Sequence, residues 1–78
     1  MEKFDIEIIC DSICKDLDYE INHRIESRKF SILRKKYKGI SKEEYKNEKL
    51  KYKKYKEIGR MLQSNIHDIL DEIKNETQ

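Results

Sequence analysis

Only one segment of this chain carries a strong signal for a turn. The 78 residues include no proline and two glycines, so a helix has few places to end. In the segment 38–44, KGISKEE, Gly39 suits the left-handed conformation that follows a helix end. Ser41 and Glu44 have the spacing of a capping box, which starts a helix. The sequence therefore predicts a first helix, a turn over residues 38–41 and a second helix.

Apolar residues in the first half of the chain recur three or four positions apart, which is the period of one helix face. The pattern is regular up to Ile25 but not beyond it, because Arg28 and Lys29 occupy the next expected positions. We therefore predict a helix over about residues 3–37, and the sequence leaves open whether this helix is continuous or has a break or bend near Ser27 to Ser31. The predicted buried stripe of this helix consists of Ile6, Ile9, Cys10, Ile13, Leu17, Ile21 and Ile25.

A second apolar stripe, at heptad spacing, predicts a helix over about residues 42–75. Gly59 falls on this stripe, although glycine costs about 1 kcal/mol of helix propensity relative to alanine. We expect either the close approach of another helix there or a local bend. Two helices of similar length with a short connection favour an all-α fold, a long antiparallel helical hairpin in which residues 1–78 form one domain. The second stripe consists of Tyr45, Tyr52, Tyr55, Leu62, Ile66, Ile69 and Ile73.

The first helix carries more apolar residues than one partner helix can cover. At 78 residues, the chain is also near the size at which a single core is only marginally adequate. Exposed apolar groups on a small helical rod commonly mark association. We therefore expect a homodimer that forms a four-helix bundle, or a hairpin that docks on a different protein. The apolar residues that lie off the main stripe are Phe4, Ile8, Tyr19, Phe30 and Leu33.

Charge is segregated along the sequence. Residues 24–57 hold 14 of the 18 Lys and Arg residues and only five of the 16 acidic residues. A hairpin folded at Gly39 would gather these cations at the end with the turn and leave the other end acidic. Cations interleaved with tyrosines are typical of nucleic-acid binding, because the cations neutralise phosphates and the rings stack on bases. The residues predicted to contact phosphates are Arg28, Arg34, Lys35, Lys36, Lys38, Lys42, Lys49, Lys53 and Lys56.

Two alternatives to nucleic-acid binding remain open for these residues. Tyr45, Tyr52 and Tyr55 have the spacing of the buried stripe, so they can equally form the hairpin core with their hydroxyl groups at the surface. A lysine-rich helix face is also a common means of keeping a small helical protein soluble.

One combination of residues has the chemistry of a metal centre. Cys10 and Cys14 are four apart on the first helix, His67 and Asp71 are four apart on the second, and folding at the turn brings the two pairs level. The phase of the helices argues against a site, because His67 and Asp71 are expected to point outward and Cys10 belongs to the buried stripe. We therefore expect no metal and no cofactor. A Cys10–Cys14 disulfide is disfavoured by geometry.

Signals for catalysis, membrane insertion and secretion are all weak. The sequence contains no glycine-rich phosphate loop and no nucleophile motif, and both histidines, His23 and His67, fall in ordinary helical contexts, so we do not predict an enzyme. No segment approaches the roughly 20 apolar residues that a membrane span requires. The first residues lack the basic end and apolar run of a secretion signal. We expect a cytoplasmic protein with both cysteines reduced.

Three hypotheses for function follow. In the first, a small non-catalytic regulatory protein contacts nucleic acid or another polyanion through the basic end, without base specificity. In the second, a phage or mobile-element protein docks on a host or defence protein and inhibits it, with Phe4, Ile8, Phe30 and Leu33 as anchors. In the third, the chain is a structural coiled-coil oligomer without a ligand. The charge segregation favours the first hypothesis over the second.

Overall fold

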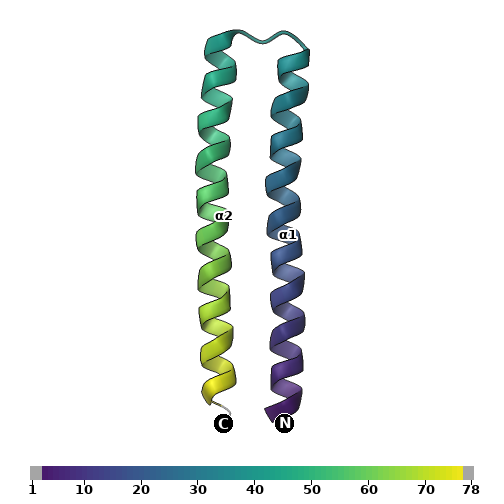
Figure 1. Cartoon of the computed structure of the whole chain (residues 1–78), viewed down its shortest axis with the longest axis vertical. Helices are drawn as coiled ribbons and strands as arrows, with labels where there is room; N and C mark the ends of the chain where they lie inside the picture. The colour runs from purple at the N-terminus through teal and green to yellow at the C-terminus, as the bar shows by residue number, and fades with distance from the viewer. Residues whose placement is uncertain (1–2, 77–78) are drawn as a thin grey trace.

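Two long helices packed side by side make up the whole of the described structure, a computed structural model that describes residues 3–76 (Figure 1). Helix α1 spans Lys3–Tyr37 and helix α2 spans Lys42–Glu76. They run antiparallel, so both ends of the chain lie at one end of a rod that measures 57 × 16 × 8 Å between its Cα atoms. The predicted all-α hairpin is confirmed, and the predicted helices over residues 3–37 and 42–75 agree with these bounds.

The turn forms as its sequence predicts. Gly39 has a φ of 88°, in the left-handed region that glycine adopts without strain, and its N–H donates to the carbonyl of Lys36 at 3.1 Å. The hydroxyl oxygen of Ser41 accepts a hydrogen bond of 3.1 Å from the N–H of Glu44, so the serine part of the capping box is in place. These contacts end α1 and begin α2.

Helix α1 continues through Ser27 to Ser31 without interruption, which decides between the two alternatives that the sequence left open. The apolar pattern weakens there, yet Ile25 and Ile32 lie one heptad apart and are both buried against α2. Between them, the Arg28 guanidinium lies over the Tyr55 ring, 4.5 Å from its centroid. A cation that packs on an aromatic ring can therefore occupy the edge of the helix interface, and the helix does not need to bend.

The residues that face the other helix include pairs eleven positions apart as well as pairs seven positions apart. On α2, the pairs Glu48 and Gly59, and Gly59 and Leu70, follow the eleven-residue spacing. An eleven-residue repeat corresponds to about 3.67 residues per turn, close to the 3.6 of a straight helix, whereas a strict heptad at 3.5 imposes a left-handed supercoil. The predicted heptad stripe is therefore only partly buried. Its members Leu62 and Ile69 are 50% and 56% exposed.

The two helices approach each other closely at Gly59. A β-carbon at this position would lie 3.0 Å from Cδ1 of Ile25 and 3.3 Å from Cγ2 of Ile21. The first distance is shorter than normal van der Waals contact allows. The expected close approach is confirmed, and α2 shows no break at this residue.

The part of the apolar pattern that the hairpin does not bury lies along one long side of the rod. A groove on this side is lined by residues of both helices, among them Ile21 and Arg24 of α1 and Ile58 and Leu62 of α2. Helical spacing places the remaining members on the same side, because residues three, four or seven positions apart share a helix face. We call this surface the apolar face; its exposed members are Ile9, Ile13, Leu17, Ile58, Leu62, Ile69 and Ile73.

The five residues predicted to lie off the main stripe are exposed as expected: Phe4, Ile8, Tyr19, Phe30 and Leu33. In addition, no helix within residues 3–76 is long and apolar enough to cross a membrane.

Candidate functional site

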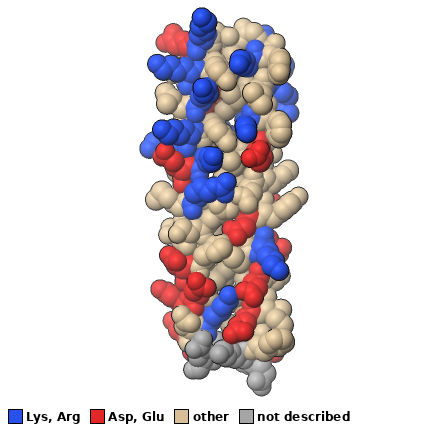
Figure 2. Space-filling model, in the orientation of Figure 1, with Lys and Arg blue, Asp and Glu red and all other residues tan. Residues whose placement is uncertain are grey.

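The segregation of charge along the sequence becomes a segregation along the rod. Lys and Arg side chains gather at the end with the turn, and acidic side chains become more frequent toward the termini (Figure 2). All nine residues predicted to contact phosphates are exposed. The structure nevertheless separates them into groups with different surroundings.

Four of these nine residues belong to a regular row on α2. Lys42, Lys46, Lys49, Lys53 and Lys56 follow one another at alternating steps of four and three residues, so they share one side of the helix. All five are exposed, and the row is about 21 Å long at 1.5 Å per residue. We call it the lysine row. Lys46 was not predicted as a member, although its helical spacing from Lys42, Lys49 and Lys53 was a visible signal.

None of the five lysines forms an ion pair with a carboxylate anywhere in the described range 3–76. Two carboxylates of this half of the rod pair with other lysines. Glu48 lies 3.4 Å from Nζ of Lys35 and 3.8 Å from Nζ of Lys51, and Glu57 lies 3.7 Å from Nζ of Lys54. Within residues 3–76, no ion pair therefore neutralises a lysine of the row.

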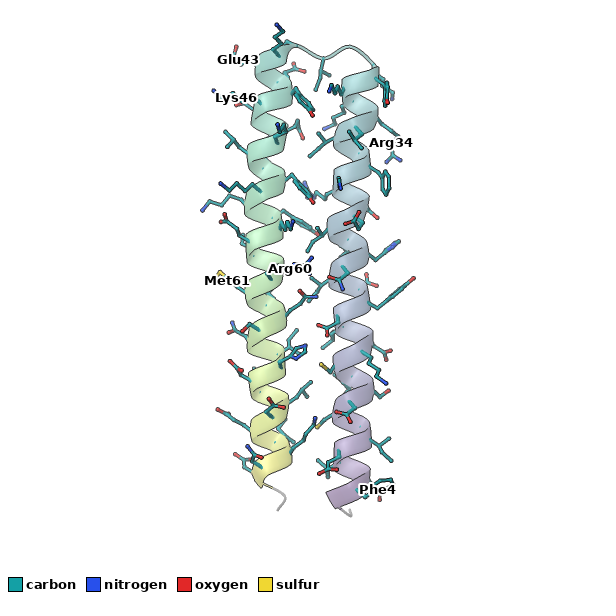
Figure 3. The ribbon with its side chains drawn as sticks, viewed as in Figure 1. Phe4, Arg34, Glu43, Lys46, Arg60 and Met61 are labelled. Atoms are coloured by element: carbon teal, nitrogen blue, oxygen red, sulfur yellow. The ribbon has the colours of Figure 1, made fainter. Side chains whose placement is uncertain are left out.

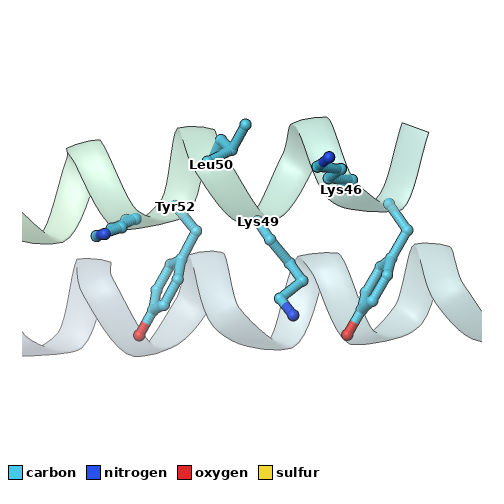
Figure 4. A pocket seen from close by; sticks show the side chains of 6 residues that line it. Lys46, Lys49, Leu50 and Tyr52 are labelled. Atoms are coloured by element: carbon cyan, nitrogen blue, oxygen red, sulfur yellow. The ribbon is translucent and has the colours of Figure 1, made fainter. Parts of the chain in front are cut away.

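A shallow groove of about 460 Å³ runs beside the lysine row (Figure 4). Tyr45, Leu50 and Tyr52 provide apolar lining, and Lys46, Lys49 and Lys53 stand around it. An adjacent groove brings Lys29 and Leu33 of α1 next to Lys49. This surface of the rod therefore combines ammonium groups from both helices with aromatic and aliphatic carbon.

The tyrosines of α2 pack mainly within the hairpin. Tyr45, Tyr52 and Tyr55 are half-buried, which favours the core interpretation of these rings over base stacking. Lys36 and Lys49 lie over the Tyr45 ring, with Nζ 5.0 Å and 5.4 Å from its centroid.

Unlike the rings of these tyrosines of α2, the ring of Tyr37, beside the turn, is freely accessible. Tyr37, at the end of α1, is 90% exposed and lies next to Lys36 and Lys38 in the sequence. Arg34 points away from α2, so it does not join the lysine row (Figure 3).

Toward the termini, the same long side of the rod carries three polar contacts between the helices, which we call the polar ladder. Nζ of Lys74 donates to a carboxylate oxygen of Asp11 at 2.7 Å. Further along, Asp18 contacts His67. The third contact joins Asn22 to Arg60 and Gln63.

The polar ladder extends the lysine row. Lys46, Lys53, Arg60, His67 and Lys74 follow one another at seven-residue steps along α2. Among the described residues of α1, polar partners are found for the last three of these side chains but not for Lys46 and Lys53. Toward the turn, the acids and the amide of α1 give way to Lys29, Leu33 and Lys36.

The contact between Asp11 and Lys74 changes the titration of both groups. The hydrogen bond and charge of Lys74 lower the pKa of the Asp11 carboxyl, and the hydrogen bond to Asp11 raises the pKa of Lys74. Each charged form stabilises the other. The pair therefore links the two helices near the chain ends over a wide pH range.

The second step of the polar ladder is a cluster of three side chains, Cys14, Asp18 and His67. Sγ of Cys14 lies 3.2 Å from Nε2 of His67, and the same nitrogen lies 2.9 Å from Oδ2 of Asp18. Sγ and Oδ2 are 3.8 Å apart. Partial burial, together with the Asp18 carboxylate, raises the pKa of the Cys14 thiol.

This cluster differs from the predicted combination Cys10, Cys14, His67 and Asp71. Cys10 is buried in the interface, as expected for a member of the stripe, and Asp71 is exposed. His67 does not point outward as predicted, because the eleven-residue spacing of α2 moves it to the edge of the interface. Asp18 was missed, although its position four residues after Cys14 places both on one side of α1.

Comparison with known proteins gives no relative from which a function could be carried over. No protein-family model matches the chain, and no significant match is found among curated protein sequences or among solved structures.

Proposed function

We propose that the protein is a small non-catalytic regulatory protein that binds nucleic acid through the lysine row. The observation that supports this proposal is the absence of any carboxylate partner for the five lysines within residues 3–76, on the side of the rod where Lys29 adds a further cation. Surface lysines that only maintain solubility are usually interspersed with acids. A regular row without acids fits a ligand that has regularly spaced negative charges.

The dimensions of the row fit a phosphate backbone. About 21 Å of helix corresponds to roughly six phosphates along one strand of duplex DNA, which are about 3.4 Å apart along the axis. Lysine is a flexible point charge and does not distinguish bases, so binding should depend little on nucleotide sequence. Tyr37 is available as a stacking surface at the end of the rod.

The salt dependence of binding tests this proposal quantitatively. If the five lysines neutralise five phosphates, the logarithm of the binding constant should fall with that of the salt concentration with a slope of about −4.5 on duplex DNA. Between about 50 and 200 mM salt, this slope lowers the affinity about 500-fold. The measurement is fluorescence anisotropy of a labelled duplex or single strand titrated with the protein.

A pair of double variants distinguishes the lysine row from a general effect of charge. Lys46→Gln with Lys53→Gln removes two members of the row, and we expect a slope shallower by about 1.8. Lys51→Gln with Lys54→Gln removes the same charge from the other side of the same helix, where both lysines lie next to glutamates. Equal losses in the two double variants, or no loss in either, would contradict the proposal.

We further propose that two hairpins associate through the apolar face to form a four-helix bundle. The exposed side chains of this face come from both helices and form a continuous surface over the half of the rod near the chain ends. Complete burial of a fully exposed large apolar side chain contributes about 1.5–3 kcal/mol, and the seven residues of this face, which are 38–56% exposed, would each contribute part of that value. This face replaces the off-stripe residues as the expected dimer contact.

The oligomeric state of two neighbouring variants tests this association. Leu62→Asp places a charge within the apolar face, and light scattering coupled to size exclusion should show a monomer. Met61→Asp is the matched control, because Met61 is 65% exposed and points away from α1 (Figure 3). A dimer that persists in Leu62→Asp, or a monomeric parent chain, would show that the hairpins do not associate through this face.

The alternative proposal, docking on a host or defence protein, has less support. Its four anchors are exposed, but Phe4 and Ile8 lie near the chain ends, whereas Phe30 and Leu33 lie near the turn. The 22 residues between Ile8 and Phe30 correspond to about 33 Å of helix. The anchors therefore form two separate small patches rather than one interface centre, whereas the residues that dominate a protein interface usually cluster near its middle.

A further inference from the structure

We propose that Cys14, Asp18 and His67 form a zinc-binding site that links α1 to α2. The site is separate from the lysine row and does not depend on nucleic-acid binding. It uses the second step of the polar ladder, where one sulfur, one oxygen and one nitrogen atom come together from two helices.

The three atoms already have nearly the separations that a metal ion would impose. Zinc binds sulfur at about 2.3 Å and nitrogen or oxygen at about 2.0–2.2 Å, so tetrahedral ligands lie roughly 3.3–3.6 Å from one another. The observed separations are 3.2 Å for Sγ to Nε2, 2.9 Å for Nε2 to Oδ2 and 3.8 Å for Sγ to Oδ2. Each differs from the tetrahedral value by no more than about half an ångström.

Hydrogen bonds among the three side chains do not account for all three of their close contacts. His67 Nε2 is close to both Cys14 Sγ and Asp18 Oδ2. The thiol donates to Oδ2 of Asp18, and a neutral ring with its proton on Nε2 donates to the same oxygen, so the 3.2 Å approach of Sγ to Nε2 has only the weak acceptor capacity of sulfur. A metal ion would use all three atoms at once. The thiol would release its proton to solvent, and the imidazole would keep one proton on Nδ1 and bind through Nε2.

The chemistry of the three ligands selects the metal. Magnesium and calcium prefer oxygen ligands, whereas a thiolate together with an imidazole and a carboxylate suits zinc. Three protein ligands leave the fourth position of a tetrahedral zinc ion to water. Cys14 and Asp18 are partly buried and His67 is about half-exposed, so an ion can enter from solvent.

Binding of cobalt(II), a spectroscopic substitute for zinc, to the full chain tests the site. We expect one cobalt ion per chain, a thiolate-to-cobalt charge-transfer band in the near ultraviolet, and displacement of the cobalt by zinc. Cys14→Ser should abolish the band. Loss of a group that merely orients a ligand costs about 10–100-fold in metal affinity, so Asp18→Asn and His67→Gln should each weaken binding by at least about tenfold.

The chain offers a control residue of the same type for each ligand. Cys10→Ala, His23→Gln and Asp71→Asn remove a thiol, an imidazole and a carboxylate from outside the cluster. We expect all three controls to bind cobalt as the parent chain does. Far-ultraviolet circular dichroism verifies that each variant keeps its helices.

Thermal unfolding gives a second readout. Zinc should raise the melting temperature of the parent chain and leave that of Cys14→Ser unchanged, because an ion that binds only the folded hairpin stabilises it. The proposal is overturned if the parent chain shows no charge-transfer band with cobalt. It is equally overturned if the band survives Cys14→Ser, or if Cys10→Ala removes it.

Discussion

Replacing Gly59 by alanine should reveal how closely the two helices approach. Alanine favours the helical conformation by about 1 kcal/mol relative to glycine. The new β-carbon, however, would lie 3.0 Å from Cδ1 of Ile25, a side chain that is only 2% exposed and has little freedom to move. Overpacking of this kind costs about 1–3 kcal/mol. We therefore expect Gly59→Ala to lower the free energy of unfolding by up to about 2 kcal/mol, or to leave it unchanged.

The substitution Ile25→Val separates these two effects, because it removes the Cδ1 atom that the new β-carbon would meet. Alone, it should cost about 0.5–1.5 kcal/mol. In its presence, Gly59→Ala should become stabilising by about 1 kcal/mol, because the gain in helix propensity remains and the clash is relieved. The coupling free energy between the two positions is then about 1–3 kcal/mol.

Urea unfolding followed by circular dichroism measures these values, at one chain concentration because association also stabilises the fold. Ile32→Val serves as the control background. It shortens another buried isoleucine of α1 that lies about 10 Å along the helix from Ile25. There, Gly59→Ala should have the same effect as in the parent chain. Equal stabilisation by Gly59→Ala in all backgrounds would refute the close approach.

Further predictions concern the turn and the contact near the chain ends, each measured by urea unfolding. Gly39→Ala should cost about 1–2 kcal/mol, because its φ of 88° is unfavourable for a residue with a side chain. Ser41→Ala removes the acceptor for the first turn of α2 and should cost about 1 kcal/mol. Since Lys74 lowers the pKa of Asp11, the stability that Asp11 contributes should be present at neutral pH and disappear below about pH 4. An advantage of the parent chain over Asp11→Asn that persists unchanged at lower pH would show that the charge of Asp11 is not its source.

The backbone of this protein could be predicted from sequence because its decisive signals are local. Gly39 and Ser41 act on the few residues around them, and their effect does not depend on how the helices pack. Apolar residues that recur three or four positions apart over a long stretch likewise identify a helix, whatever that helix packs against. The continuity of α1 at Ser27 to Ser31 could not be predicted, because the sequence shows Arg28 only as a charge, although it packs on Tyr55.

The orientation of the helices was harder to predict, because small errors in period accumulate. A straight helix departs from a strict heptad by about 20° per repeat, or about 80° over four repeats. Near the turn, Tyr45 and Tyr52 therefore face the partner as the heptad predicts. Toward the chain ends, Leu62 has rotated onto the apolar face, and His67 reaches Cys14 on the opposite side. The apolar face and the contact of His67 with Cys14 both depend on this rotation. The spacing of residues in the sequence therefore identified their side-chain types but not which residues of the other helix they contact.

The hairpin is flat, because the two helices lie side by side and its Cα atoms extend over 57 × 16 × 8 Å. The lysine row, beside the turn, and the apolar face, nearer the chain ends, therefore lie on opposite sides of the rod. Two such hairpins joined by their apolar sides would display their lysine rows in opposite directions. Such a dimer would be bivalent, with one anion-binding surface on each outer side, and could hold two segments of nucleic acid parallel to each other.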